Sequence, residues 1–253
     1  MKTRFLFVLM AGMAMFFAAC SETGEVLDEV VVANDDIKSV EAAELVGDSC
    51  DFSAVLTEDE IAGLMLMREE EKFAHDVYIT FYESYGKPIF KNISNSEAVH
   101  TKAILYLLNG FGLADPAVDG VGNFKDELFT GLYNSLTEKG STELAEALKV
   151  GALIEEIDIK DLEELIEATD NETIKRVYGN LLRGSTFHLK AFTAVLKFMG
   201  ETYTPTIISQ EEYDAIVNSS TEDDENDVAD DDGDSNGTFV PGTGACDGTG
   251  PNA

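Results

Sequence analysis

The sequence predicts an all-α protein whose main domain is an up-down four-helix bundle, with a longer crossover connection between its halves and short accessory helices. Four long segments carry apolar residues in alternating steps of three and four, the spacing of an amphipathic helix. Glycine and proline residues mark the breaks between these segments. No stretch shows the sustained alternation of a half-buried strand, so a sheet is not needed.

The first expected helix, residues 57–85, begins at a capping-box spacing formed by Thr57 and Glu60. Glu71 breaks its apolar stripe at a position where the spacing predicts an apolar side chain. Glu71 also lies in the charge run EEEK, which is compatible with a solvated surface. Both interpretations of Glu71 stay open.

The second expected helix, residues 92–110, follows a break at Pro88 and carries Glu97 and His100 on its apolar face. Because these two residues are three apart, both project from one side of the helix, about one turn apart. If the helix began at Ser94, Glu97 would instead be the partner of a capping box.

The third and fourth expected helices, about 141–168 and 171–199, also carry polar residues in their apolar rows. Glu155 lies on the seam of the third helix, and Ser185 and His188 lie in the row of the fourth. Short accessory helices are expected over 125–139 and from Ser209.

Polar rows inside a helical bundle need partners, because an unpaired buried carboxylate is costly. A Glu-x-x-His pair on one helix, with glutamates from other helices, is typical of di-iron and di-manganese carboxylate bundles. Carboxylates can bridge two cations, and imidazoles add neutral nitrogen ligands. The pattern therefore indicates a metal site. In the metal-free interpretation, the histidines are core residues bonded to the backbone.

Several sequence strings resemble a known family. REEEKFAHDVY (residues 68–78) resembles helix one of the ferritin-like, rubrerythrin-related superfamily, and SEAVH (residues 96–100) resembles its helix-two Glu-x-x-His. More narrowly, residues from about 57 to 217 are similar to the DUF2202 family, on the strings REEEKFAHDVY, VGALIEEIDIKDL, NLLRGSTFHLKAF and SQEEYDAI. The resemblance implies a centre of two iron ions, with manganese as an alternative. The implied ligands are Glu71, Glu97, His100, Glu155 or Glu156, and His188.

The resemblance leaves two points open. Helix four of the superfamily usually supplies a second Glu-x-x-His, but Ser185 stands three residues before His188, which puts the second metal in doubt. On helix three the apolar seam favours Glu155, whereas aligning the two halves of the chain on their paired glutamates favours Glu156.

The first nineteen residues have the features of a lipoprotein signal peptide. Lys2 and Arg4 give a basic start, and the following apolar run ends in FAAC, which resembles the bacterial lipobox. The run is short for a membrane-spanning helix, which needs about 20 residues. We therefore expect lipidation of Cys20 and attachment to a membrane of the bacterial cell envelope. Ser21, in place of an aspartate, favours the outer membrane over the inner one.

Acidic segments flank the expected bundle, residues 57–217. The chain has 17 basic and 49 acidic residues, a net charge of −32. Residues 20–56 are expected to form an acidic tether, and residues 218–253 an acidic disordered tail. Such a charge repels phosphate backbones, so we expect no nucleic-acid partner.

Two weaker signals involve the flanking segments. Cys50 and Cys246 could pair in an oxidising compartment. The tail string DGDSNG begins like a calcium loop, but Thr243 stands where such a loop needs a bidentate glutamate. We therefore expect the tail to be solvated rather than to bind calcium specifically.

The sequence supports two hypotheses for function. The first is an envelope-anchored iron protein that reacts with dioxygen or peroxide, as an oxidase or peroxidase. The chain has no CxxC pair, so redox activity would need an external electron donor. The alternative is a metal-free bundle that binds a partner at the cell surface. A homodimer is compatible with both.

Overall fold

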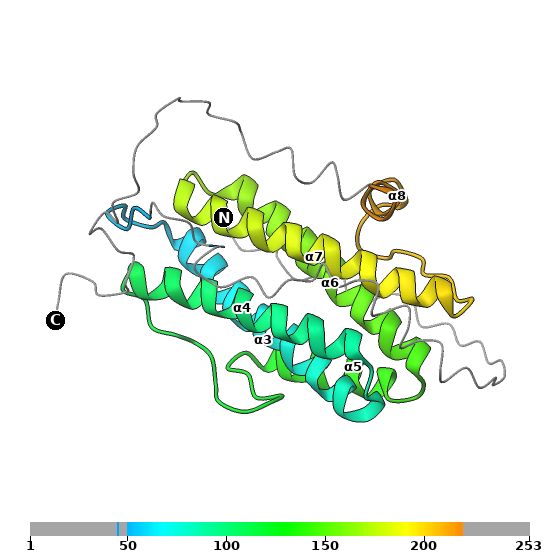
Figure 1. The fold of residues 1–253 in the computed structure, drawn as a ribbon. Helices are drawn as coiled ribbons and strands as arrows, with labels where there is room; N and C mark the ends of the chain where they lie inside the picture. Colours follow the sequence, from blue (N-terminus) through cyan, green and yellow to red (C-terminus); the bar gives the residue numbers. More distant parts are fainter. Residues whose placement is uncertain (1–44, 46–49, 220–253) are drawn as a thin grey trace, which may run out of the picture.

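The computed structural model describes residue 45 and residues 50–219. Within these ranges the regular elements are all helices, which confirms the all-α prediction. No helix there has both the length and the apolarity of a membrane span. The signal segment, Cys20, most of the tether, Cys246 and the tail from residue 220, with its DGDSNG string, lie outside the described residues. The helices are α3 (Glu58–Tyr85), α4 (Pro88–Gly110), α5 (Glu127–Gly140), α6 (Leu144–Ala168), α7 (Glu172–Phe198) and α8 (Gln210–Asn218) (Figure 1).

Helix α3 begins where its cap predicts. The Thr57 side chain accepts a hydrogen bond from the Glu60 backbone N–H, and Glu60 Oε2 accepts one from the Thr57 N–H at 2.8 Å. Gly86 ends the helix at φ +64°, a left-handed conformation that glycine adopts without strain. Helix α8 begins with the same reciprocal cap between Ser209 and Glu212.

Helix α4 begins at Pro88, earlier than the expected start at residue 92. Proline fits the first turn of a helix as well as a break, because an N–H at that position has no intrahelical acceptor. Ser94 consequently lies inside the helix, and its hydroxyl donates to the Lys91 carbonyl at 2.9 Å. The capping-box interpretation of Glu97 is therefore wrong, and Glu97 is a buried residue in the interior of α4.

The four long helices run alongside one another (Figure 1). Helix α3 packs against α4 and α6 against α7, and the two pairs meet where α3 contacts α6 and α4 contacts α7. The longer connection between the pairs includes α5, which packs against α3 and α6. Helix α8 contacts α7. This arrangement encloses the faces on which the polar rows were expected.

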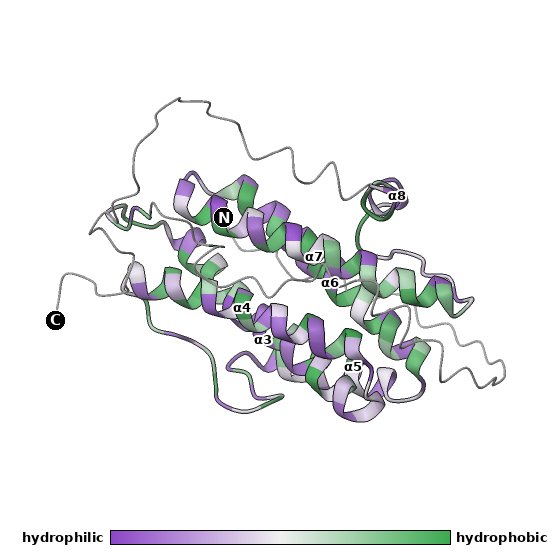
Figure 2. Cartoon of the chain, in the orientation of Figure 1, coloured by the Kyte–Doolittle hydropathy of each residue, from purple (hydrophilic) through white to green (hydrophobic). Residues whose placement is uncertain are grey.

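Buried apolar side chains form two clusters at different levels along the helices. One cluster is rich in phenylalanine and the other in leucine. On each long helix, buried polar residues lie between the members of the two clusters, and polar and apolar residues mix along the ribbons in Figure 2. We call these residues the polar layer: Glu71, Glu97, His100, Glu155, Asp158, Ser185 and His188.

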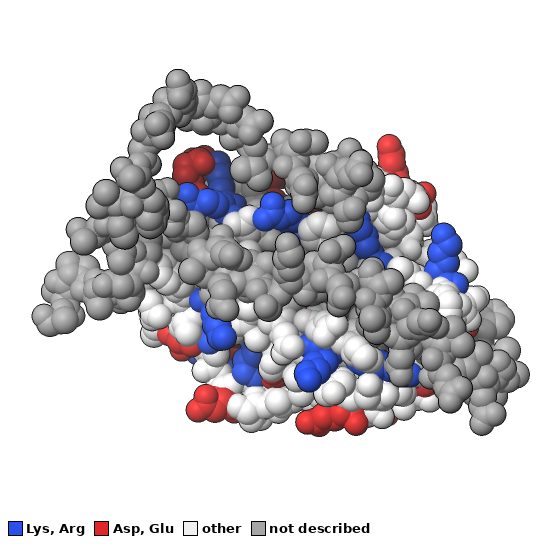
Figure 3. Space-filling view, in the orientation of Figure 1, with Lys and Arg blue, Asp and Glu red and all other residues white. Residues whose placement is uncertain are grey.

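Charge is distributed unevenly among the long helices. Helices α3 and α6 each carry eight acidic and two basic residues. Helix α4 carries one acidic and two basic residues, and α7 carries one acidic and five basic residues. Figure 3 shows Lys and Arg side chains on the face where α4 and α7 lie. The net charge of −32 is therefore not spread evenly over the surface.

Candidate metal centre

The expected ligands come from four different helices and meet in the polar layer. Each of them is almost completely buried, with 1–3 % of its surface exposed. The helix periodicity explains this convergence, because every one of these residues lies on the face that its helix turns toward the other three. The contributing residues are Glu71 from α3, Glu97 and His100 from α4, Glu155 from α6 and His188 from α7.

Two groups of three residues have the spacing of metal ligands. In the first group, Glu71, Glu97 and His100 each offer a ligand atom within 4.8 Å of the other two. The Nδ1 atom of His100 lies 2.8 Å from Glu97 Oε2 and 3.2 Å from Glu71 Oε2. A single imidazole nitrogen thus faces two carboxylates.

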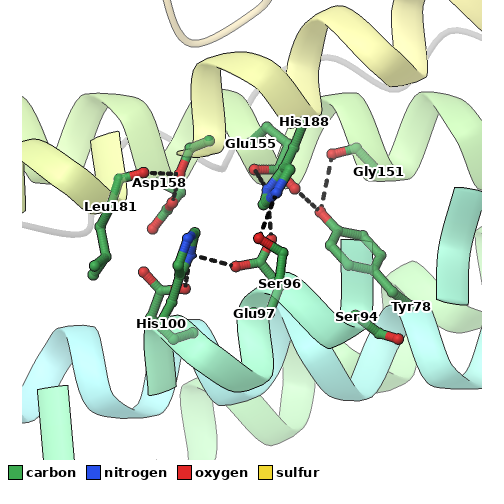
Figure 4. A network of polar contacts seen from close by, with 12 residues as sticks. Tyr78, Ser94, Ser96, Glu97, His100, Gly151, Glu155, Asp158, Leu181 and His188 are labelled. Atoms are coloured by element: carbon green, nitrogen blue, oxygen red, sulfur yellow. Dashed lines mark hydrogen bonds and ion pairs between the residues drawn. The ribbon is translucent and has the colours of Figure 1, made fainter. Parts of the chain in front are cut away.

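The second group consists of Glu97, Glu155 and His188, again within 4.8 Å of one another. The Nδ1 atom of His188 lies 2.7 Å from Glu97 Oε1 and 3.4 Å from Glu155 Oε2. Glu97 belongs to both groups and turns one oxygen toward each histidine (Figure 4). This is the arrangement of a carboxylate that bridges two cations.

Several ligand-type atoms lack hydrogen-bond partners beyond the ion pairs of the layer. Glu71 Oε1 has none among the described residues, and both carboxylate oxygens of Glu97 and the His188 Nδ1 atom have only the imidazole–carboxylate contacts given above. A buried polar atom left unsatisfied costs about 1–3 kcal/mol, and more when it is charged. A cation bound by these oxygens and nitrogens would remove that cost, so the residues fit a metal of the kind the sequence predicts.

Two further side chains hold the ligands in place. The Tyr78 hydroxyl donates to Glu155 Oε1 at 2.5 Å, and it also lies 3.3 Å from the Gly151 carbonyl. The Nε2 atom of His188 is 3.0 Å from the Ser96 hydroxyl, which leaves Nδ1 directed at the carboxylates. Such outer contacts fix ligand orientation in metal sites.

The buried carboxylates and imidazoles of the two groups shift one another's pKa values. Burial favours the neutral form of Glu97, but His188 and His100 outweigh it and hold the pKa of this carboxyl well below its usual range. Burial raises the pKa of Glu71 to about 8. Burial lowers the pKa of His188, but Glu97 and Glu155 reverse the effect and raise it to about 9. A metal ion bound by these groups would therefore have to displace protons from them.

The structure separates the two alternatives on α6. Glu155 lies in the second group, whereas Glu156 lies in neither. Glu156 Oε2 accepts hydrogen bonds from the backbone N–H groups of Thr206, Ile207 and Ile208 at 2.9, 2.8 and 3.1 Å. Its other oxygen accepts one from the Tyr203 hydroxyl. Glu156 thus fastens the segment between α7 and α8, and it would have to give up four hydrogen bonds to reach a metal.

Asp158 belongs to the layer but was not anticipated from the sequence. It is 4 % exposed, and one of its oxygens accepts a hydrogen bond from the Ser185 hydroxyl. Its position three residues after Glu155 could have indicated it, because that spacing puts both side chains on one face of α6. Ser185 is fully buried in the layer, as its place in the apolar row of α7 predicts.

Comparisons with other proteins identify a family and relatives of this chain. Residues 60–220 match the family model described as Uncharacterized protein domain (DUF2202). The chain is 50 % identical over 168 residues to Uncharacterized protein MJ0754 of Methanocaldococcus jannaschii, covering 66 % of this chain and 91 % of that protein. The crystal structure of hypothetical protein MJ0754 from Methanococcus jannaschii superposes with a TM-score of 0.67 at 48 % identity. It covers 68 % of this chain and 99 % of that one.

Proposed function

The chain belongs to the DUF2202 family, and from that premise and the geometry of the polar layer we propose that it is a ferritin-like four-helix-bundle protein with a di-iron carboxylate centre that reacts with dioxygen or peroxide. The observation that carries this proposal is the position of Glu97. Its two oxygens lie 2.8 and 2.7 Å from the Nδ1 atoms of two different histidines.

The residues divide between two metal positions. Glu71, Glu97 and His100 would hold one ion, and Glu97, Glu155 and His188 would hold the other. A set of carboxylates and imidazoles without thiolates suits iron, and manganese is the alternative. When bound, the two iron ions would supply electrons for reduction of an O–O bond.

The protein's own part is to hold the ligands and keep water out. Tyr78 fixes one oxygen of Glu155 at 2.5 Å. The apolar clusters on both sides of the layer exclude bulk water, which strengthens every electrostatic interaction inside. The chain contains three cysteines and no CxxC pair, so the electrons would come from an external donor.

The proposed place of action is the bacterial cell envelope, with the outer membrane favoured over the inner one. The support is the sequence of residues 1–21, with its basic start, apolar run and FAAC string. Mass spectrometry of the protein purified from a bacterial membrane fraction tests this. We expect a chain that begins at a diacylated Cys20, and a soluble chain with an unmodified Cys20 would contradict it.

Metal analysis after anaerobic iron loading tests the centre itself. We expect two Fe(II) per chain in the wild type and loss of both in Glu97→Gln, because Glu97 belongs to both groups. Glu83→Gln is the matched control, since Glu83 is an exposed carboxylate on α3. Equal iron content in wild type and Glu97→Gln would refute the proposal.

A second candidate function is a metal-free bundle that binds a partner. The observation that favours it is the ion pairing within the layer, where His100 lies 3.2 Å from Glu71 and His188 lies 2.7 Å from Glu97. Thermal unfolding with and without a chelator separates the two functions. A filled site stabilises the fold by about 2.7 kcal/mol when free metal is 100 times its Kd. No change on chelation would favour the metal-free protein.

A further inference from the structure

One carboxylate oxygen of Asp158 has no hydrogen-bond partner among the described residues. Its Oδ2 atom accepts a hydrogen bond from the Ser185 hydroxyl, whereas Oδ1 is buried and has no partner among the described residues. The Ser185 hydroxyl also lies 3.1 Å from the Leu181 carbonyl of its own helix. Ser185 therefore fixes one side of the Asp158 carboxylate and leaves the other side open.

Asp158 lies beside the candidate metal centre (Figure 4). After burial, the largest influence on the pKa of Asp158 is the charge of Glu71, followed by Glu70, Glu155 and Glu97, and together these raise the pKa well above its usual range. Three of these four carboxylates belong to the two ligand groups. Figure 4 shows Asp158 on the same side of the network as His100.

The charge balance of the proposed centre calls for a fourth carboxylate. Two divalent cations carry four positive charges, but the two ligand groups contain only three carboxylates, Glu71, Glu97 and Glu155. An uncompensated charge in a buried, low-dielectric site is expensive. A fourth carboxylate makes the centre neutral. The usual position for it on the fourth helix is three residues before the histidine, and here that position holds Ser185.

We propose that Asp158 is the fourth carboxylate ligand of the centre, on the side of Glu71 and His100, and that Ser185 positions it. The carboxylate that α7 lacks is thus supplied by the neighbouring helix α6, and the serine hydroxyl turns it toward the metal. Asp158 lies outside both groups of closely spaced ligand atoms. Its Oδ1 atom makes no hydrogen bond among the described residues, so coordination through Oδ1 would leave the hydrogen bond from Ser185 to Oδ2 available to orient the carboxylate. This inference rests on the proposed di-iron function.

The test is an anaerobic Fe(II) titration of the full chain and of three variants, with iron bound per chain and affinity as readouts. In Asp158→Asn we expect one of the two ions to bind at least about 10–100-fold more weakly, because even the loss of a group that only supports a metal ligand typically costs that much. The double variant Asp158→Ala with Ser185→Glu returns the carboxylate to α7, and we expect it to recover the second ion. Glu164→Gln, an exposed carboxylate further along α6, is the control and should bind as the wild type does.

The outcomes separate this inference from the proposed function. If the wild type binds no iron, the di-iron function itself fails. If the wild type binds two ions and Asp158→Asn binds both with unchanged affinity, Asp158 is not a ligand and the di-iron function stands. If Asp158→Asn does not fold, Ser185→Ala replaces it, because that variant keeps the carboxylate but frees its orientation. A few-fold weaker second ion supports the inference, and an unchanged titration overturns it.

Discussion

At the scale of single residues, two adjacent glutamates have different roles because they point in different directions. Glu155 and Glu156 are adjacent on α6, and both are buried. Consecutive residues on a helix point about 100° apart, so one carboxylate faces the polar layer and the other faces the segment between α7 and α8. The choice between them depends on which segment packs against α6, which no local pattern reveals.

The two glutamates are therefore expected to respond differently to the same substitution. Glu155→Gln should lower iron content, because it removes a charged ligand of the second group. Glu156→Gln should leave iron content unchanged and lower the free energy of unfolding by about 2 kcal/mol, since it weakens hydrogen bonds to a charged acceptor. Iron analysis and urea denaturation of both variants check this. Loss of iron in Glu156→Gln would contradict it.

Tyr78 is a core side chain that also contacts the candidate ligand Glu155. Tyr78→Phe keeps the buried ring and removes the hydroxyl that donates to Glu155. We expect iron affinity to fall about tenfold, the lower end of the loss seen when an outer contact of a metal ligand is removed. Titration with Fe(II) measures this, with Tyr82→Phe, one turn further along α3, as the control. An effect of equal size in the control would show that the layer is not involved.

At the scale of elements, the sequence pattern predicts long helices well and their ends less well. The caps of α3 and α8 follow from side chains that bond to their own first turn, so local sequence is sufficient. The first turn of α4 is missed because Pro88 is compatible with both a break and a helix start. Glu71, Glu97, His100 and His188 are predictable as buried because periodicity alone places them on an apolar face.

The role proposed for Asp158 could not be predicted in this way. It depends on contact between α6 and α7 at Ser185, and a contact between helices leaves no mark in the periodicity of either one. The connection from residue 199 to residue 209 has no periodic signal either, so its attachment to Glu156 becomes visible only in three dimensions.

Two glycines of α7 provide a prediction about helix packing. A methyl group added at Gly184 would lie 2.6 Å from Cε1 and Nε2 of His100, whereas one at Gly179 would meet nothing within 4 Å. Gly179→Ala should raise the free energy of unfolding by about 0.5–1 kcal/mol, because alanine favours a helix more than glycine does. Gly184→Ala should lower both stability and iron content by displacing His100. Chemical denaturation and iron analysis check the pair, and normal iron content in Gly184→Ala would contradict this packing.

At the scale of the whole molecule, net charge differs from helix to helix, but all four long helices share the polar layer. The acidic helices α3 and α6 and the more basic helices α4 and α7 both contribute to the polar layer. The expectation that the protein does not bind nucleic acid rests on its net charge. Because basic side chains gather on one face (Figure 3), that expectation stays a prediction.

The stability of the metal-free protein should depend on pH because of the buried layer. The pKa of Glu71 is raised from 4.5 to about 8, and that of His188 from 6.5 to about 9. Both groups bind protons more tightly in the folded state, so both contribute to the free energy of unfolding at low pH. The contribution of Glu71 is lost as pH rises from 4.5 to about 8, and that of His188 as pH rises from 6.5 to about 9. Glu97, with its lowered pKa, acts oppositely, since its contribution is lost as pH falls below its unfolded value of 4.5.

We therefore expect the metal-free protein to be most stable at roughly pH 4–5 and to lose stability progressively toward pH 9. Thermal unfolding in the presence of a chelator, at a series of pH values, measures this. Stability that rises between pH 7 and pH 9 would contradict the charge assignment of the layer. With metal bound, the same rise in pH should cost less, because the ligands are already deprotonated.

The band of polar groups across the middle of the helices also governs how they align. A slip of one turn, about 5.4 Å, would carry an imidazole or carboxylate of the sliding helix into the phenylalanine-rich or leucine-rich cluster. Leucine and phenylalanine alone would tolerate such a shift, because many offsets bury similar area. The buried carboxylates and imidazoles disfavour such offsets, because moving them into an apolar cluster carries a large free-energy penalty. The residues proposed to bind a cation thus also favour a single register for the helices.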